Sequence, residues 1–311
     1  MSHCLVTGGA GAIGSNLAMA LLEAGHQVTV VDDLSSGHRT FVPASARFVE
    51  GSVADDEVLG RAFASAPEYV FHLAALFANQ NSVDHPQRDL EVNGQGLLKV
   101  LEHAQAAKVR KVLYTSSSCV YGNKAVMRES DTDFQPDTPY AITKLLGERY
   151  CQFWAHHHKL DTVIVRLFNT YGPHEFPGRY RNVIPNFFQL AMAGKPLTVT
   201  GTGEETRDFN FVADTVAGIM GAMWADTKPG DVFNLASGNE TRIIDLVNAI
   251  NAITGNPGGV TFSPRRSWDM VSTRRGDPAK ALAAFGHRPR VSLQEGLERT
   301  YHWLRAQAAH D

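Results

Sequence analysis

Residues 7–17 read TGGAGAIGSNL, and this stretch decides the expected fold. It follows a short apolar run, Cys4–Val6, and opens an apolar pattern of helical spacing that continues to Leu22. Its glycines recur every three residues, at Gly8, Gly11 and Gly14. Such a turn lets a pyrophosphate come close and lets the following helix pack on the strand, while the free N–H groups of the helix favour phosphate. With a strand before it and a helix after it, the motif predicts a dinucleotide site rather than a merely tight turn.

An acidic pair ends the next expected strand. The apolar run Val28–Val31 is followed by Asp32 and Asp33. A carboxylate at this place binds both ribose hydroxyls of an adenosine and repels a 2′-phosphate. The sequence therefore predicts NAD, rather than NADP, as the cofactor.

Strand and helix signals alternate through the first half of the chain. Strands are expected at Arg47–Val49, Tyr69–Ala75 and Lys111–Ser116, and helices at Asp56–Ala64 and Asn93–Ala107. This alternation is typical of an α/β fold with a doubly wound parallel sheet, which binds ligands at the carboxyl ends of its strands.

We expect two interleaved units. Residues 1–168 plus about 209–235 would form a Rossmann-type NAD-binding domain, with Phe209–Val212 returning to the central sheet. Residues 169–208 plus 236–311 would form a smaller C-terminal α/β lobe that binds the substrate.

The composition excludes several classes of partner. A net charge of −3 gives no electrostatic reason to bind nucleic acid or an anionic membrane, and no apolar run approaches the roughly 20 residues of a membrane span. The first strand begins almost at once, which leaves no room for a signal peptide. Three cysteines without metal spacing, and the consecutive His156–His158, predict no metal site and favour a reducing cytoplasm.

A second cluster carries the expected chemistry. Hydroxyl side chains at 115–118 follow the strand Lys111–Ser116, and Tyr140 and Lys144 share one face of a helix that starts at Pro139. A lysine ammonium beside the phenol, with a positive nicotinamide nearby, would lower the tyrosine pKa from about 10. A serine hydroxyl would then hold a substrate oxygen while the tyrosine takes its proton.

Together these motifs closely resemble the extended short-chain dehydrogenase/reductase family, within it the nucleotide-sugar epimerases and dehydratases. The resemblance covers nearly the whole chain. Its segments are TGGAGAIG at 7–14, VVDD at 30–33, HLAA at 72–75, SSSCVYG at 116–122, YAITK at 140–144, RLFNTYGP at 166–173, GTGEETRDFNFVAD at 201–214 and FNLASGNETRI at 233–243.

The resemblance implies Ser117 as the catalytic hydroxyl, Tyr140 as the base and Lys144 as its electrostatic helper. At Ser52 many relatives have an aspartate near the adenine. The implied cofactor-binding residues are Gly8, Gly11, Ala12, Ile13, Gly14, Asp32, Asp33, Ser35, Ser36, Gly37, Ser52, Val53, Leu73, Ala74, Ala75, Asn93, Ser116, Tyr140, Lys144 and Phe168.

The substrate is expected to meet residues from both units. Arg207 matches the family's phosphate-binding arginine, and a guanidinium suits phosphate because it offers a bidentate, permanently charged fork. The choice between Arg265 and Arg266 stays open, and Arg179 or Arg181 would hold a carboxylate if the substrate is a uronic acid. The expected substrate-binding residues are Gln80 and Asn81 in the loop at 75–82, Ser117, Ser118, Asn169, Arg179, Asn182, Val183, Arg207 and Arg266.

A departure from the family pattern indicates the reaction. Dehydratases carry an acidic pair directly after the catalytic hydroxyl, and decarboxylases keep a glutamate at the second place; here these residues are Ser118 and Cys119. Neither is an acid–base group matched to neutral pH. We therefore expect NAD-dependent epimerisation of a nucleotide-diphosphate sugar, at C4 of a UDP-hexose or UDP-hexuronate, through a transient 4-keto sugar.

Two alternatives stay open. One is a 4,6-dehydratase or 4-keto reductase on the same scaffold, and the other is a non-catalytic, dinucleotide-sensing protein, which would usually have lost the pair Tyr140 and Lys144. The resemblance also implies a homodimer through two long helices of the first domain. The sugar, the nucleotide base and the pathway are left undetermined.

Overall fold

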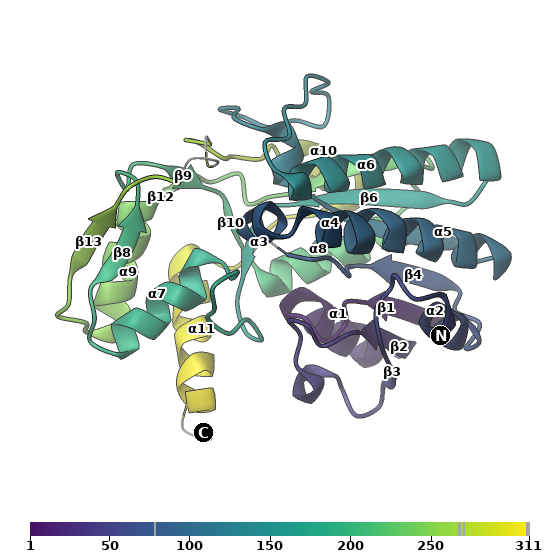
Figure 1. Cartoon of the computed structure of the whole chain (residues 1–311), viewed down its shortest axis with the longest axis horizontal. Coiled ribbons are helices and arrows are strands. Elements are labelled where there is room, and N and C mark those ends of the chain that lie inside the picture. Colours follow the sequence, from purple (N-terminus) through teal and green to yellow (C-terminus); the bar gives the residue numbers. More distant parts are fainter. Residues whose placement is uncertain (78, 267–268, 270, 309–311) are drawn as a thin grey trace.

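A seven-stranded parallel sheet forms the centre of the computed structural model, which describes residues 1–77, 79–266, 269 and 271–308 (Figure 1). The strand order is β11-β6-β5-β4-β1-β2-β3. The strands are β1 (His3–Thr7), β2 (Gln27–Asp32), β3 (Arg47–Glu50), β4 (Tyr69–His72), β5 (Lys111–Ser117), β6 (Thr162–Leu167) and β11 (Asp231–Leu235). The doubly wound parallel sheet predicted from the sequence is confirmed.

Helices cover both faces of this sheet because its strands are apolar on both sides. Along β1, Cys4 and Val6 pack in one buried cluster with α1 and α8, whereas Leu5 packs in another with α2, α5 and α6. The helices are α1 (Ala12–Glu23), α2 (Asp56–Phe63), α5 (Gly96–Ala106), α6 (Pro139–Phe153) and α8 (Val212–Trp224). The alternation of side chains along each strand thus fixes which helix lies on which face.

The smaller lobe lies at one end of the sheet (Figure 1). It pairs β8 with β13 and β9 with β12, and helix α10 returns to pack on β11. Its elements are α7 (Val183–Met192), β8 (Leu197–Thr200), β9 (Thr206–Arg207), β12 (Thr241–Arg242), α9 (Ile243–Thr254), β13 (Val260–Ser263), α10 (Ala279–Phe285) and α11 (Leu293–Ala308).

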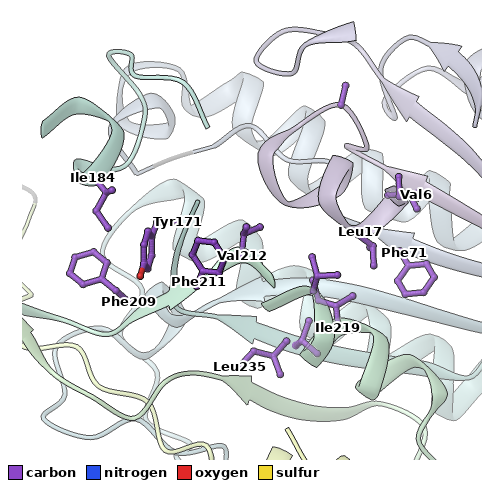
Figure 2. Packing of buried hydrophobic residues seen from close by; sticks show 14 of the residues in the cluster. Val6, Leu17, Phe71, Tyr171, Ile184, Phe209, Phe211, Val212, Ile219 and Leu235 are labelled. Atoms are coloured by element: carbon purple, nitrogen blue, oxygen red, sulfur yellow. The ribbon is translucent and has the colours of Figure 1, made fainter. Parts of the chain in front are cut away.

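One apolar cluster runs from the sheet into the lobe. Figure 2 shows Val6, Leu17 and Phe71 at the sheet end and Ile184 and Phe209 at the lobe end of the same packed cluster. Because the two parts share a core, the lobe holds its position against the carboxyl ends of the strands.

The sequence prediction for Phe209–Val212 is wrong. Phe209–Phe211 forms β10, which pairs with β7 (Asn169–Tyr171) in a separate two-stranded sheet, and Val212 begins α8. The position beside β6 in the central sheet belongs instead to β11. The chain therefore crosses from lobe to sheet through α8, not through a strand.

Two expected elements have different bounds. Strand β4 ends at His72, and the Leu73 N–H makes one further hydrogen bond, of 3.1 Å, to the Thr7 carbonyl on β1. Ahead of α5, helical structure already begins with α3 (Asn79–Asp84) and α4 (Pro86–Asp89) and continues through a π-helical turn, Leu90–Gln95. Among the described helices, none has the length and apolar character needed to cross a membrane.

Candidate active site

A cavity of about 300 Å³ opens at the carboxyl ends of β1, β2, β4, β5 and β6. The glycine turn and Asp32 line one part of it, and Ser117, Tyr140 and Lys144 line another. Residues 169–173 and Arg274 contribute from the second half of the chain. The parallel sheet thus gathers at one edge the residues that the sequence distributes over its whole length.

Only glycine fits two positions of the turn after β1. Gly8 has φ +71°, and a Cβ on it would lie 2.7 Å from the Ala74 nitrogen. A Cβ on Gly14 would lie 2.1 Å from the Gly8 carbonyl oxygen, so α1 packs directly on the turn. The N-cap residue of α1 is Gly11, which has no side chain to cap the helix, and Ala12–Gly14 at its start line the cavity. Backbone N–H groups at that helix end suit a pyrophosphate.

Asp32 is held at the end of β2 by backbone N–H groups. Its carboxylate accepts hydrogen bonds of 2.9 Å from Ala10 N and 2.9 Å from Leu34 N. Burial raises the pKa of Asp32, while these backbone bonds lower it. The carboxylate also lines the cavity, and each oxygen retains a lone pair that suits a ribose hydroxyl. The glycine turn and Asp32 together fit the adenosine and pyrophosphate of NAD.

Ser117 and Tyr140 meet where β5 ends and α6 begins. Ser117 Oγ accepts a hydrogen bond from Cys119 N at 3.2 Å. Thr138 caps α6 by accepting from Ala141 N at 3.3 Å, and the Tyr140 N–H donates to Ser82 Oγ at 3.0 Å. Both Ser117 and Tyr140 are buried yet line the cavity, so the local capping of α6 positions the phenol.

Lys144 lies one helical turn after Tyr140 on α6. Its Nζ donates to the Thr115 carbonyl at 2.8 Å and lies 5.6 Å from the centroid of the Tyr140 ring. Burial lowers the pKa of Lys144 to about 8. Burial also raises the pKa of Tyr140, although a hydrogen bond with Ser117 lowers it. Among the protein's own groups desolvation outweighs the favourable contacts of the phenol. The lowering of its pKa that the sequence predicts, with a positive nicotinamide nearby, stays a prediction.

Most of the predicted cofactor residues line the cavity, and two do not. Asn93 instead accepts from Leu76 N at 2.7 Å and donates to Asp89 at 2.7 Å, so it fixes the loop that follows β4. Gly37 packs on the glycine turn, where a Cβ would lie 2.8 Å from the Ala10 carbonyl oxygen. Those that line it are Gly8, Gly11, Ala12, Ile13, Gly14, Asp32, Asp33, Ser35, Ser36, Ser52, Val53, Leu73, Ala74, Ala75, Ser116, Tyr140, Lys144 and Phe168.

Fewer than half of the predicted substrate-binding residues line the cavity. Ser117, Ser118, Asn169 and Asn182 line the cavity. Outside the lining lie Arg179, Arg207 and Arg266, together with Gln80, Asn81 and Val183. Arg207 donates to its neighbour's carbonyl, Thr206 O, at 2.8 Å and lies 3.6 Å from an Asp269 oxygen.

The remaining five have other partners or positions. Arg179 forms an ion pair with Asp84 at 3.0 Å, and Gln80 donates to the same carboxylate at 2.8 Å. Asn81 donates to the Phe77 carbonyl, Val183 packs on the core at the start of α7, and Arg266 is exposed.

Sequence reasoning found the right loop but missed its cavity-lining amide. Asn79 lines the cavity, donates to Cys119 Sγ at 3.5 Å and accepts from Thr138 at 3.0 Å. Ala78, in the same loop, lies outside the described residues. No sequence signal separates Asn79 from Gln80 and Asn81, because all three are amides in one polar run.

Two buried charged residues of the lining were also missed. Glu175 accepts from Asn182 Nδ2 at 2.9 Å, and burial raises the pKa of Glu175 to about 7. Arg274 is also buried, and nothing in the sequence shows this. Within the described ranges, no three His, Cys, Asp or Glu side chains come together as a possible metal site.

Comparison with known proteins places these features in one family. The model of the NAD dependent epimerase/dehydratase family matches residues 4–236. A UDP-glucose 4-epimerase from Mycolicibacterium smegmatis is 36% identical over 308 residues, which cover 97% of this chain and 98% of that protein.

Two further relatives match over almost the whole chain. A UDP-N-acetyl-alpha-D-glucosaminuronate decarboxylase from Bacillus cytotoxicus is 32% identical, covering 97% of this chain and 98% of that protein. The solved structure of an epimerase from Methanothermobacter thermautotrophicus is 47% identical with a TM-score of 0.97, covering 99% of this chain and 94% of that one.

Proposed function

The chain belongs to the NAD dependent epimerase/dehydratase family, and from this premise we propose that it inverts C4 of a UDP-hexose or UDP-hexuronate. One observation carries the proposal. Ser117, Tyr140 and Lys144 share the cavity wall, while the next two residues, Ser118 and Cys119, offer no carboxyl group for elimination.

The protein's own groups handle the proton at C4. Tyr140 takes the proton of the C4 hydroxyl, and Ser117 hydrogen-bonds the same oxygen. Lys144, fixed by the Thr115 carbonyl, places a positive charge beside the phenol. Because the pKa of Lys144 is lowered to about 8, the lysine carries this charge at a pH below that value. That charge stabilises the phenolate that forms as the proton leaves.

NAD, when bound, supplies a hydride acceptor in the first half of the reaction and a hydride donor in the second. The 4-keto sugar turns about its diphosphate linkage and presents its other face. Tyr140 then returns the proton to the oxygen, which completes the inversion without net oxidation. Arg207 and Asn182, which belong to the expected substrate-binding residues, would hold the diphosphate during this turn.

Elimination of water is the principal rival. It requires an acid and a base at the carbons beside C4, in addition to the groups that act on the C4 oxygen. Ser118 and Cys119 line the cavity next to Ser117 and supply no carboxyl group. A non-catalytic dinucleotide sensor is disfavoured because Tyr140 and Lys144 are both retained and buried in the cavity wall.

Product analysis by NMR tests the proposal. The purified protein is incubated, without added NAD, with UDP-, dTDP-, GDP- and CDP-sugars. A C4 epimer of a UDP-sugar is the expected product. A 4-keto-6-deoxy sugar, or a pentose formed with loss of CO₂, would overturn the proposal.

A substitution at the base gives a second, independent readout. Tyr140→Phe should lower turnover about 10²- to 10⁴-fold, the usual range for a general acid–base group, while NAD binding persists. Tyr150→Phe, also on α6 but away from the cavity lining, is the matched control. An unchanged turnover in Tyr140→Phe would remove the phenol from the mechanism.

Family resemblance further supports a homodimer through α5 and α6. Leu90, Ile142 and Phe153, on α6 or in the helical segment ahead of α5, are 48%, 54% and 44% exposed, an apolar surface that pairing would cover. Light scattering on the purified protein tests this proposal. We also propose that the enzyme works in the cytoplasm, because its three cysteines favour a reducing compartment. We further propose the two units expected from the sequence: residues 1–168 plus about 209–235 bind NAD, and residues 169–208 plus 236–311 bind the substrate.

A further inference from the structure

Glu175 is a buried carboxyl group that the proposed reaction does not use. Its side chain is 5% exposed and lines the cavity. Asn182 donates to its Oε1 twice, from Nδ2 at 2.9 Å and from the backbone N at 3.4 Å. Because both bonds end on Oε1, Oε2 is the oxygen that can carry a proton and present it to a ligand.

Two contacts place this carboxyl group near the expected pyrophosphate of NAD. Ser15 Oγ lies 2.8 Å from Nδ1 of His174, the residue before Glu175. Asn16 Nδ2 donates to the Pro173 carbonyl at 3.2 Å. Ser15 and Asn16 lie near the start of α1, whose free N–H groups suit phosphate. The segment that carries Glu175 therefore lies against the phosphate-binding end of this helix.

On its other side Glu175 meets a residue expected to hold the substrate. Asn182, its hydrogen-bond partner, directly precedes α7 and belongs to the residues proposed to hold the diphosphate of the sugar. Asn182 Nδ2 also donates to the carbonyl of Thr170, in the same cavity lining, at 3.4 Å. The carboxyl group thus lies between two places where a diphosphate is expected. An ionised carboxylate there repels phosphate, whereas a protonated carboxyl group can donate a hydrogen bond to it.

The charged groups nearest in the chain favour ionisation only weakly. The charge of Arg181 lowers the pKa of Glu175, but its guanidinium donates to the Ser36 carbonyl. His174, and His38 in the loop after β2, both have a pKa that burial lowers, so these imidazoles are neutral above pH 7. Burial outweighs Arg181 and the bonds from Asn182, and it raises the pKa of Glu175 to about 7.

The ionisable groups of the surrounding elements have partners of their own or lie far from the segment. Helix α7 carries no ionisable side chain, and the one on α1 lies at its far end. On α11, Glu295 and Arg299 pair with each other at 2.5 Å. Backbone N–H groups bind the carboxylates of Asp32 at the end of β2 and of Asp214 on α8. Burial raises the pKa of Tyr171 on β7, so this phenol stays neutral.

We propose that Glu175 is protonated when a diphosphate occupies the cavity and that its Oε2–H donates a hydrogen bond to a phosphate oxygen, so that binding takes up one proton from solvent. The diphosphate is that of NAD or that of the nucleotide sugar, and the second case rests on the function proposed above. Because the ionised form disfavours the ligand, the apparent dissociation constant rises as the protonated fraction falls.

A purely structural role for Glu175 predicts a different behaviour. Oε1 accepts from Asn182 whether or not Oε2 carries a proton, so a carboxyl group that only fixes Asn182 makes no link between binding and pH. Proton uptake on binding therefore separates the two roles.

The test measures binding and proton uptake at pH 6 and pH 8. UDP-glucose is titrated into the NAD-loaded protein, and equilibrium dialysis of the same protein gives the dissociation constant of NAD. A pH indicator in weakly buffered solution counts the protons taken up with UDP-glucose, and turnover does not disturb the count because epimerisation releases no net proton. Between the two pH values the wild-type dissociation constant should rise about tenfold for at least one ligand.

Glu175→Gln is the matched variant, because its amide oxygen accepts from Asn182 and its amide N–H donates as the protonated carboxyl group does. The tenfold rise and the proton uptake should both be absent from it. Lys144, whose pKa is lowered to about 8, loses its charge equally in both proteins, so the variant corrects for that effect. Glu102→Gln, on an exposed position of α5, is the control and should keep the wild-type pH dependence.

Each outcome supports the inference or overturns it. A tenfold rise that depends on Glu175, for NAD or for UDP-glucose, supports it and identifies the diphosphate that the carboxyl group contacts. Wild-type constants that are equal at the two pH values, or smaller at pH 8, overturn it without any variant. The same pH dependence in Glu175→Gln overturns it too, since another group then titrates. If binding is proton-linked through Glu175 but the product is not a C4 epimer, the inference stands and the proposed reaction fails.

Discussion

Two arginines, Arg166 and Arg274, are buried in the part of the chain that the structure describes, and their surroundings differ. Arg166, on β6, is 2% exposed and donates from Nε and Nη2 to the two oxygens of Glu148 at 2.8 and 2.7 Å. Its Nη1 donates to Tyr121 Oη at 2.7 Å. Arg274, 7% exposed, donates from Nη1 to Cys119 Sγ at 3.5 Å.

The difference separates a structural charge from one suited to a ligand. Glu148 lies on α6 one turn after Lys144 and also accepts from Ser116 on β5 at 2.5 Å. The Arg166–Glu148 pair therefore joins β6 to β5, which carries Ser117, and to α6, which carries Tyr140 and Lys144. The Arg166–Glu148 pair has its partners within the chain, whereas among the described residues no carboxylate oxygen lies within 4.0 Å of the Arg274 guanidinium.

Breaking the satisfied pair should have the largest effect on stability. Glu148→Gln leaves the Arg166 charge buried without its carboxylate, which should lower the free energy of unfolding by about 3–5 kcal/mol. Urea denaturation at pH 7 measures the loss. The double variant Glu148→Gln/Arg166→Met should recover part of it, because no charge is then left unpaired. A loss below about 1 kcal/mol in the single variant would show that the pair does not hold these elements together.

Glu175 is a buried charge of the cavity wall whose effect depends on pH. Burial raises its pKa from 4.5 to about 7, so the folded state binds the proton more tightly than the unfolded state. This stabilisation is complete below pH 4.5 and is lost as the pH rises to about 7. At 1.36 kcal/mol per pKa unit, the loss reaches about 3 kcal/mol.

The variant Glu175→Gln should abolish this pH dependence while its amide oxygen still accepts from Asn182. Its free energy of unfolding should exceed that of the wild type at pH 8 by up to about 3 kcal/mol, and the two should be similar near pH 5. Glu102→Gln, on an exposed position of α5, is the control. The same difference between Glu175→Gln and the wild type at both pH values would rule out titration of Glu175 in this range.

Asp32 is intermediate between Arg166 and Arg274: its carboxylate has backbone partners and also lines the cavity. Asp32→Asn removes the charge that repels a 2′-phosphate. The preference for NAD over NADP, measured as a ratio of dissociation constants by fluorescence titration, should fall about 10- to 100-fold. Asp33→Asn is a matched comparison, because Asp33 accepts from Ser35 and pairs with Arg88. An unchanged ratio in Asp32→Asn would assign the discrimination to another group.

The parts of this site that the sequence indicates are those encoded by short spacings. The glycine turn, Asp32 and the pair Tyr140 and Lys144 each depend on one strand end or one helical turn, and the structure brings them to one cavity. The parallel sheet followed from alternation in the same way.

The parts that it missed depend on contacts between distant segments. Arg274 meets Cys119 across 155 residues, and only the folded chain shows that it is buried while Arg266 is exposed. Phe209–Phe211 reads as a strand of the main sheet, but its partner β7 was not visible as a strand. Burial and pairing of this kind are properties of tertiary structure, which overrides local pattern.

Removing the charge of Arg274 should have the smallest effect on stability and so sharpens the contrast with Arg166. Arg274→Met loses a cation that has no carboxylate partner, so the free energy of unfolding should stay within about 1 kcal/mol of the wild type or rise. Urea denaturation with Arg275→Met as control measures this. A loss as large as that expected for Glu148→Gln would instead make Arg274 a second structural charge, satisfied by contacts within the chain.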